Sequence, residues 1–264
     1  MSDYRYISFC RESHTGVITL RRPQVMNALN KEITQELHQL LEEIPSYFPD
    51  IRVIILTGEG RGFCSGADLS RMGTGGSENR TENSKNGRKR IQELAQAFRD
   101  LPQPVIAAIN GPAVGAGFSL AMASDIRIAS ESSRFSAIFV RRGLVPDTAA
   151  SNTVVAVAGF AVAAEMSLTG SIYSSSWALS KGLVSKVVPD ELLMPTAIEI
   201  AAIISANPPL AVRNTKKLLH VRTPDWSVIV ENEDNMGSEL YDTKDQKEAV
   251  AAFLEKRKPN YIGQ

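Results

Sequence analysis

Residues 104–119 read Pro-Val-Ile-Ala-Ala-Ile-Asn-Gly-Pro-Ala-Val-Gly-Ala-Gly-Phe-Ser, and this stretch decides most of the fold prediction. Its apolar run, Val105–Ile109, stands between Pro104 and Asn110-Gly111, which is typical of a short strand buried on both faces. The glycines that follow let the backbone approach its neighbours closely and adopt positive φ angles. The stretch therefore predicts a buried strand that ends in a tight turn near the start of a helix.

Similar apolar runs occur on both sides of this stretch. Ile51–Leu56 precedes it and Ile126–Ala129 follows it, and segments with helical spacing separate the runs. Such an alternation predicts an α/β protein with a largely parallel sheet. Two short strands, Tyr6–Cys10 and Gly16–Leu20, are expected near the N-terminus, and Asn30 is placed to cap the helix that follows them.

The pattern changes to helices after about residue 188. Four helices are expected there: Leu192–Ala206, Pro208–His220, Val228–Leu240 and Lys244–Lys256. We therefore expect a β/α core in residues 1–190 and a helical region in residues 191–264.

Composition narrows the class of protein further. Lys and Arg total 29, as do Asp and Glu, so the net charge is zero, whereas a nucleic-acid binder usually carries a basic excess. Cys10, Cys64 and the three histidines form no metal-binding spacing. No apolar run approaches the roughly 20 residues that cross a bilayer, and no signal-peptide pattern begins the chain. We expect a cytoplasmic protein that binds neither metal, nucleic acid nor membrane.

A second glycine-rich turn, residues 58–69, follows the run Ile51–Leu56. Neither turn contains a P-loop or a G-x-S-x-G nucleophile elbow, and the likeness to a dinucleotide-binding G-x-G-x-x-G is loose. Two interpretations are left. Both turns either pack tightly between strands and helices, or they aim two backbone N–H groups at one oxygen as an oxyanion hole. Their spacing alone does not choose between these.

Several motifs together resemble the crotonase (enoyl-CoA hydratase/isomerase) superfamily. They are collinear from about residue 5 to residue 263 and comprise Arg22-Pro23, Asn27-Ala28-Leu29, Ile54–Gly58, Gly62–Leu69, Pro104–Ser119, Gly143–Asp147, Leu168–Gly170, Gly182–Val184 and Ala252–Arg257. The resemblance implies a spiral core of repeated ββα turns and C-terminal helices that help to form a trimer or a dimer of trimers. It also implies a coenzyme A thioester as substrate, with no further cofactor.

The resemblance also assigns roles by position. It implies that the backbone N–H groups of Ala67 and Ala116 form an oxyanion hole. It places the following residues along the coenzyme A path: Val25, Ala28, Ser65, Ala67, Asp68, Leu69 and Ser70, with Phe253 and Lys256 at the nucleotide end. For Phe253 and Lys256, an amphipathic terminal helix with a solvated charge is an equally good interpretation.

The reaction is narrowed by two missing carboxylates. Hydratases of the superfamily use two glutamates to add water, and their positions correspond to Ser119 and Phe139 here, neither of which can do acid–base work. One carboxylate remains in this region, Asp147, as in Asp-dependent enoyl-CoA isomerases. We therefore expect Δ3/Δ2 isomerisation with Asp147 carrying the proton. Phe118, Ser119 and Phe139 would line the pocket, and Phe118, Phe135 and Phe139 would keep it dry, which would make Asp147 more basic.

Other interpretations stay open. The run Asp147-Thr148-Ala149 also resembles the nucleophilic stretch of 4-chlorobenzoyl-CoA dehalogenase, although the histidine base of that enzyme corresponds to Gln92. Thioester hydrolysis at Asp147 and a non-catalytic acyl-CoA-binding homologue are further alternatives. Asp147 could also simply cap the following helix. Residues 72–90, rich in Gly, Asn and Ser, are either a surface loop or a lid.

Overall fold

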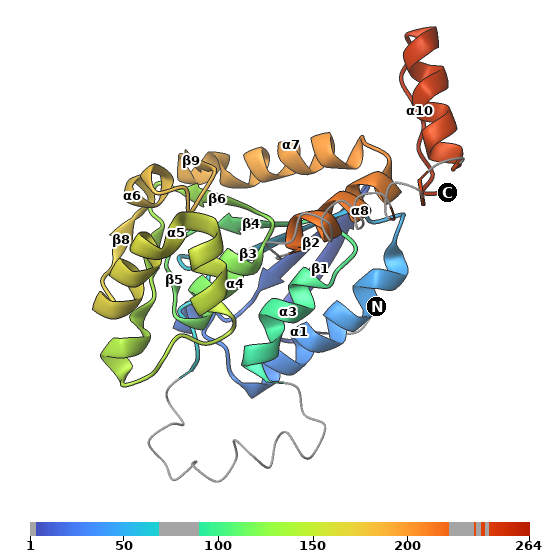
Figure 1. The fold of residues 1–264 in the computed structure, drawn as a ribbon. Coiled ribbons are helices and arrows are strands. Elements are labelled where there is room, and N and C mark those ends of the chain that lie inside the picture. The colour runs from blue at the N-terminus through green and yellow to red at the C-terminus, as the bar shows by residue number, and fades with distance from the viewer. Residues whose placement is uncertain (1–3, 69–89, 222–234, 236–238, 241–242) are drawn as a thin grey trace.

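The computed structural model describes residues 4–68, 90–221, 235, 239–240 and 243–264, and its centre is a six-stranded sheet with the order β1-β2-β3-β4-β6-β9 (Figure 1). The strands are β1 (Ile7–Glu12), β2 (Thr15–Leu20), β3 (Val53–Gly58), β4 (Val105–Ile109), β6 (Ile126–Ser130) and β9 (Lys186–Val188). Only the edge pair β1–β2 is antiparallel; the other neighbours in this sheet are parallel. The predicted α/β architecture is confirmed.

A second, smaller sheet has the order β5-β7-β8. It comprises β5 (Ala113–Val114), β7 (Arg134–Ser136) and β8 (Tyr173–Ser174). The chain alternates between the sheets, because β4 and β6 lie in the large sheet while β5 and β7 lie in the small one. Helix α4 (Ala116–Ala123) follows the first pair and α5 (Ala150–Thr169) follows the second. This alternation is the repeated ββα turn that the resemblance implied.

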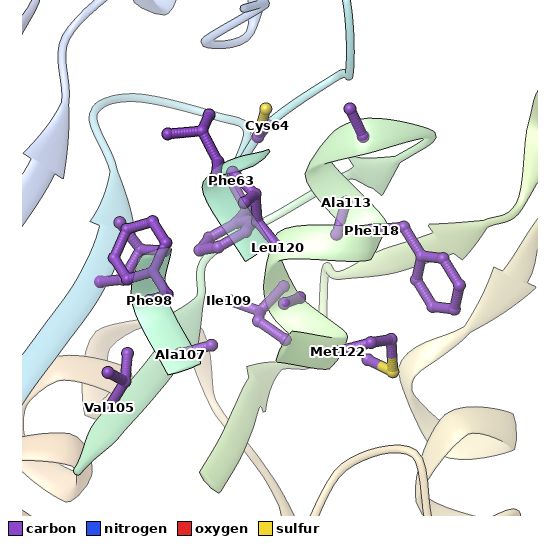
Figure 2. Close-up of a cluster of buried hydrophobic side chains, with 14 of the residues drawn as sticks. Phe63, Cys64, Phe98, Val105, Ala107, Ile109, Ala113, Phe118, Leu120 and Met122 are labelled. Carbon is purple, nitrogen blue, oxygen red and sulfur yellow. The ribbon is translucent and has the colours of Figure 1, made fainter. Parts of the chain in front are cut away.

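Helices cover both faces of the large sheet, which explains the uninterrupted apolar runs in its central strands. On one face, α7 (Leu193–Ser205) packs against β3 and β4. On the other face lie α1 (Lys31–Glu43), α3 (Leu94–Arg99) and α4. Figure 2 shows part of the hydrophobic core on this face, where Phe63, Phe98 and Leu120 gather beside Ile109. Strands buried in this way need apolar side chains at every position.

Further helices lie in the described parts of the chain. They are the short 3-10 helices η1 (Pro23–Val25), η2 (Ile44–Tyr47), η5 (Ile91–Glu93), η6 (Ile138–Arg142) and η7 (Asp190–Leu192), with α6 (Ser175–Ser180), α8 (Pro209–His220) and α10 (Lys244–Glu255). Helix α10 projects away from the sheets (Figure 1). At its base Asp245 accepts hydrogen bonds from the N–H groups of Ile262 and Gly263, at 2.7 and 2.8 Å. Arg52 donates to the carbonyl of Tyr261 and so ties the C-terminal tail to the core.

Most predicted elements are confirmed with shifts of one or two residues at their ends. Asn30 caps α1 as expected, since its Oδ1 accepts a hydrogen bond from the N–H of Ile33 at 3.1 Å. The predicted helix Val228–Leu240 lies almost wholly outside the described residues. Helix α7 packs on the sheet although it follows the expected boundary, and the division into residues 1–190 and 191–264 stays a prediction.

Helix α5 is apolar over most of its surface. By length and composition it is the single helix within the described ranges that could cross a bilayer by itself; η7–α7 with α8 would also pass as one span, but bent by 107°. The backbone of α5 leaves helical geometry at Gly159, so this helix is kinked. Phe160 and Leu168 are each 77% exposed on it. One chain alone therefore leaves an apolar strip of α5 uncovered.

Candidate active site

The two glycine-rich turns are joined by main-chain hydrogen bonds. The N–H of Cys64 donates to the carbonyl of Pro112 at 3.0 Å, and the N–H of Val114 donates to the carbonyl of Cys64 at 2.9 Å. These bonds make Cys64 and Ala113 a parallel pair at the edge of the small sheet. The two turns are therefore aligned with each other at this residue pair.

Each expected oxyanion donor lies the same number of residues after its member of the Cys64–Ala113 pair. Ala67 follows Cys64 by three residues, and Ala116 follows Ala113 by three residues. A glycine precedes each donor, with φ of +94° at Gly66 and +54° at Gly115, values that L residues rarely adopt. A side chain on Gly66 would start 3.4 Å from the backbone nitrogen of Ala116. The glycines thus allow the two turns to lie directly against each other.

The geometry leaves both donor N–H groups available. Ala116 is the first residue of α4, and the first N–H groups of a helix have no partner within it. Leu29 donates to the carbonyl of Gly66 and accepts from the N–H of Asp68, so the N–H of Ala67 points away from Leu29. Within the described ranges, neither N–H donates a hydrogen bond. Two such donors and the positive end of a helix dipole can stabilise one developing oxyanion.

Two asparagines hold the first turn in place. The Nδ2 of Asn27, which is fully buried, donates to the carbonyl of Gly62 at 2.7 Å. The Nδ2 of Asn110 donates to the carbonyl of Gly60 at 2.9 Å. In the sequence both asparagines stand out only as parts of motifs. Their hydrogen bonds to the first turn could not be predicted, because these bonds form only when three separate loops meet in the fold.

Part of the expected coenzyme A path lies along the edge formed by η1 and the first turn, namely Val25, Ala28, Ser65, Ala67 and Asp68. Ser65 donates from its Oγ to the carbonyl of Val25 at 3.0 Å. Asp68 pairs with Arg22, with 3.0 Å between Oδ2 and Nη2, and Arg22 also donates to the carbonyl of Ala28 at 2.6 Å. The carboxylate of Asp68 is therefore engaged in holding this edge together. Ala67 stands on the same edge.

The remaining residues of that path are placed less completely. Leu69 and Ser70, residues 72–89 of the expected lid and the side chain of Phe253 lie outside the described part of the structure. Lys256 is exposed just after α10. Its expected contact with the nucleotide end stays a prediction.

Phe118 and Phe139, which were expected to line the pocket, both lie in the hydrophobic core. The ring of Phe118 is fully buried and packs edge-on against Phe135, with 6.5 Å between the ring centroids. Phe139, in η6, is also buried. Phe118 presents no surface in this arrangement, so its expected place in the pocket lining stays a prediction.

Ser119 is fully buried as well, and its hydroxyl joins the second turn to Asp147. Its Oγ lies 3.1 Å from the carbonyl of Gly115 and 3.1 Å from the carbonyl of Asp147, so its single proton serves these two acceptors. At the position where the resemblance places a hydratase glutamate, the chain therefore carries a hydroxyl that links two main-chain segments. This tether brings the main chain of Asp147 close to the turn that carries the N–H of Ala116.

The interpretation of Asp147 as a helix cap is wrong. Helix α5 begins at Ala150 and its N-cap residue is Ala149, which makes no side-chain cap hydrogen bond. Asp147 lies further upstream and accepts from the N–H of Ala150 with its main-chain carbonyl, at 3.0 Å. Its carboxylate instead accepts a hydrogen bond from the hydroxyl of Thr148, with 3.0 Å between Oγ1 and Oδ1. The side chain of Asp147 therefore does not owe its placement to capping.

The thiol of Cys64, in the first turn, is kept protonated by burial. Cys64 is fully buried and its Sγ lies 3.2 Å from the carbonyl of Asn27. Burial raises the pKa of this thiol to about 12. The thiolate is the reactive form of cysteine, so Cys64 is inert at neutral pH.

A second group of charges lies apart from the two turns. Asp125 pairs with Lys216 at 3.1 Å and with His220 at 2.8 Å, and it accepts the N–H of Val105 at 2.7 Å. Burial alone would raise the pKa of Asp125, but the bonds from His220, Lys216 and Val105 outweigh it and lower this pKa. The group fastens α8 to the start of β4.

Comparison with known proteins agrees with this geometry. Residues 11–264 match the protein family described as enoyl-CoA hydratase/isomerase. The chain is 36% identical over 253 residues to a short-chain-enoyl-CoA hydratase of Clostridium acetobutylicum, with 94% of each chain covered. It is 32% identical over 253 residues to the 1,2-epoxyphenylacetyl-CoA isomerase of Escherichia coli, with 96% of each chain covered. The crystal structure of an enoyl-CoA hydratase from Bacillus anthracis is 34% identical, has a TM-score of 0.91, and is matched over 98% of this chain and 100% of that one.

The ββα spiral with its two joined turns is the crotonase fold, a scaffold for acyl-CoA chemistry. The chain belongs to the enoyl-CoA hydratase/isomerase family and is an acyl-CoA-processing enzyme of that family. The predicted family and fold are thereby confirmed, and the predicted choice of isomerisation over hydration stays a prediction.

Proposed function

We propose that this enzyme moves a double bond of an enoyl-CoA between the Δ3 and Δ2 positions, with Asp147 as the proton carrier. The observation that supports the proposal is the tether from Ser119, whose hydroxyl holds the main chain of Asp147 beside the turn that carries the second N–H donor. Both positions that hold glutamate in hydratases lack a carboxylate here.

The proposed steps use one carboxylate and no water. The thioester oxygen accepts hydrogen bonds from the N–H groups of Ala67 and Ala116. Asp147 removes a proton from the α carbon, and the electron pair delocalises over the carbonyl and the double bond to give a dienolate. The protonated Asp147 then returns the same proton to the γ carbon, and the double bond comes to rest next to the carbonyl. The two N–H donors lower the barrier because they bind the negatively charged oxygen more strongly than the neutral one.

The same geometry argues against hydration. Adding water requires a group that activates the water and a group that protonates carbon. The hydroxyl of Ser119 is fully buried and occupied by two carbonyls, and Phe139 offers only a ring. Similarity in sequence does not decide the matter, since one relative is called a hydratase and another an isomerase.

The direct test is Asp147→Asn, with Glu165→Gln as a matched control on the exposed side of α5. General acid–base groups contribute about 10²–10⁴-fold to rates, so we expect a loss of that size for Asp147→Asn on 3-enoyl-CoA substrates and none for Glu165→Gln. The rate of 2-enoyl-CoA formation is measured by chromatography. Undiminished turnover in Asp147→Asn would remove Asp147 from the mechanism.

Two alternatives are separated by the same assays. Thioester hydrolysis would place oxygen from isotope-labelled water in the free acid. A dehalogenase-type displacement would release halide and, over repeated turnovers, place the label in a new hydroxyl group of the CoA-linked product, whereas isomerisation incorporates none. A non-catalytic acyl-CoA-binding homologue would bind the thioesters without turning over any of them.

We also propose that the enzyme assembles as a homotrimer or a hexamer of two trimers. The uncovered apolar strip of α5 and the projecting α10 (Figure 1) both support association with further copies. Lys256 and Phe253 would then contact the nucleotide of a coenzyme A that is bound either by their own subunit or by a neighbouring subunit. Light scattering gives the mass directly, and a monomeric mass at assay concentration would exclude both assemblies.

A further inference from the structure

Thr148 reaches the carboxylate of Asp147 from inside the protein. Its side chain is 2% exposed, and its Oγ1 donates to the Oδ1 of Asp147 at 3.0 Å. Side chains of adjacent residues usually diverge along a regular strand or helix. This contact therefore requires an unusual backbone.

That backbone is strained. Thr148 has φ of +52° and Ala149 has φ of +61°, so two consecutive residues other than glycine occupy the left-handed region. A β-branched residue is rarely found there, and such outliers concentrate where function depends on them. The turn is held at both ends, because Ser119 binds the carbonyl of Asp147 and Thr153 donates from its Oγ1 to the carbonyl of Ala149 at 3.1 Å.

We propose that Thr148 is a positioning residue that fixes the orientation of the Asp147 carboxylate for proton transfer. The inference rests on the proposed isomerase function. One carboxylate must remove a proton from the α carbon and deliver it to the γ carbon, so its plane has to stay aligned with both. The hydroxyl of Thr148 restrains rotation of the carboxylate, and burial leaves that hydroxyl no access to solvent.

Thr148→Val tests the role, because valine keeps the β-branched shape and removes the hydroxyl. Thr148→Ala removes the hydroxyl with less strain at positive φ, and Thr148→Ser restores it. Thr34→Val is the matched control, since Thr34 is a buried threonine of α1, away from Asp147, whose hydroxyl also donates to a main-chain carbonyl. All four variants are assayed for kcat, KM and thermal unfolding.

We expect kcat to fall about 10- to 100-fold in both Thr148→Val and Thr148→Ala, because a misplaced reacting group costs up to about that much. KM should stay within about twofold, and Thr148→Ser and Thr34→Val should keep most of the activity. A kcat near that of the parent enzyme in folded Thr148→Ala, or a loss in Thr148→Ser as large as in Thr148→Ala, overturns the positioning role.

Asp147→Asn separates this inference from the function on which it rests. If Asp147→Asn is inactive while Thr148→Ala is fully active, only the role of Thr148 is lost. If Asp147→Asn keeps its activity, the proposed isomerase mechanism fails and the role of Thr148 fails with it.

Discussion

Ala116→Pro deletes one proposed oxyanion donor while leaving its helix intact. Proline is favoured at the first position of a helix, where its missing N–H has no helical partner and its fixed φ suits the helix. Ala116 holds this position in α4. Gly115, which precedes it, has φ of 54° and ψ of −125°, so it does not occupy the right-handed helical region that a following proline disfavours. Little stability should therefore be lost.

The expected loss of rate is large. Removing one oxyanion donor costs about 10²–10³ in kcat, which corresponds to about 2.7–4 kcal/mol of transition-state stabilisation. The proline ring also takes the space of the N–H, so we expect a loss at least this large. Formation of 2-enoyl-CoA is followed by chromatography, and folding is followed by thermal unfolding.

Lys31→Pro is the control for the substitution itself. Lys31 is the exposed first residue of α1, after an extended Asn30, so proline there should leave both stability and kcat unchanged. If Ala116→Pro is as stable as Lys31→Pro and retains kcat within about threefold of the parent enzyme, the paired N–H groups do not bind the transition state.

Three further predictions test the packing around the turns and the charges behind them. Gly66→Ala puts a Cβ 2.7 Å from the carbonyl of Val114 at φ of +94° and should lower the free energy of urea unfolding by about 1–3 kcal/mol, more than Gly182→Ala, where φ is +72° and no atom lies within 4 Å. A thiol reagent should modify Cys10, which is exposed, and spare Cys64 until the protein unfolds; rapid modification of both would contradict the burial of Cys64. The lowered pKa of Asp125 stabilises the fold above the ordinary aspartate pKa of about 3.9, and this contribution is lost as pH falls through the lower folded value. The free energy of unfolding should therefore drop below about pH 4, with a shallower slope in Asp125→Asn; an equal slope would exclude Asp125 as a source.

The large sheet and its helices could be predicted because burial on both faces leaves a plain sequence signal. Val105–Ile109 is apolar at every position, and β4 has the bounds that this run predicts. The small sheet could not be predicted, since β5 and β8 have two residues each and no periodicity shows in so short a strand. Yet it is the small sheet that brings the two turns together.

The candidate site was only partly predictable for a related reason. Ala67 and Ala116 came from a resemblance, because backbone donors have no residue type that marks them. Ser119 was recognised as a missing glutamate, but its use as a tether depends on Asp147 being folded back beside it. Thr148 gave no signal, since its left-handed backbone occurs without the glycine or asparagine that usually announces one.

Because Cys64 pairs with Ala113, the position of each proposed oxyanion donor depends on the number of residues that separate it from this pair. Each donor follows its residue of this pair by three positions. Inserting one residue between Cys64 and Ala67, or between Ala113 and Ala116, would therefore displace one N–H group while the pairing of the strands stayed the same. Chain length at these two places should therefore be intolerant of change, whereas the identity of the side chains carried there, apart from the glycines, can vary without altering where the amides point.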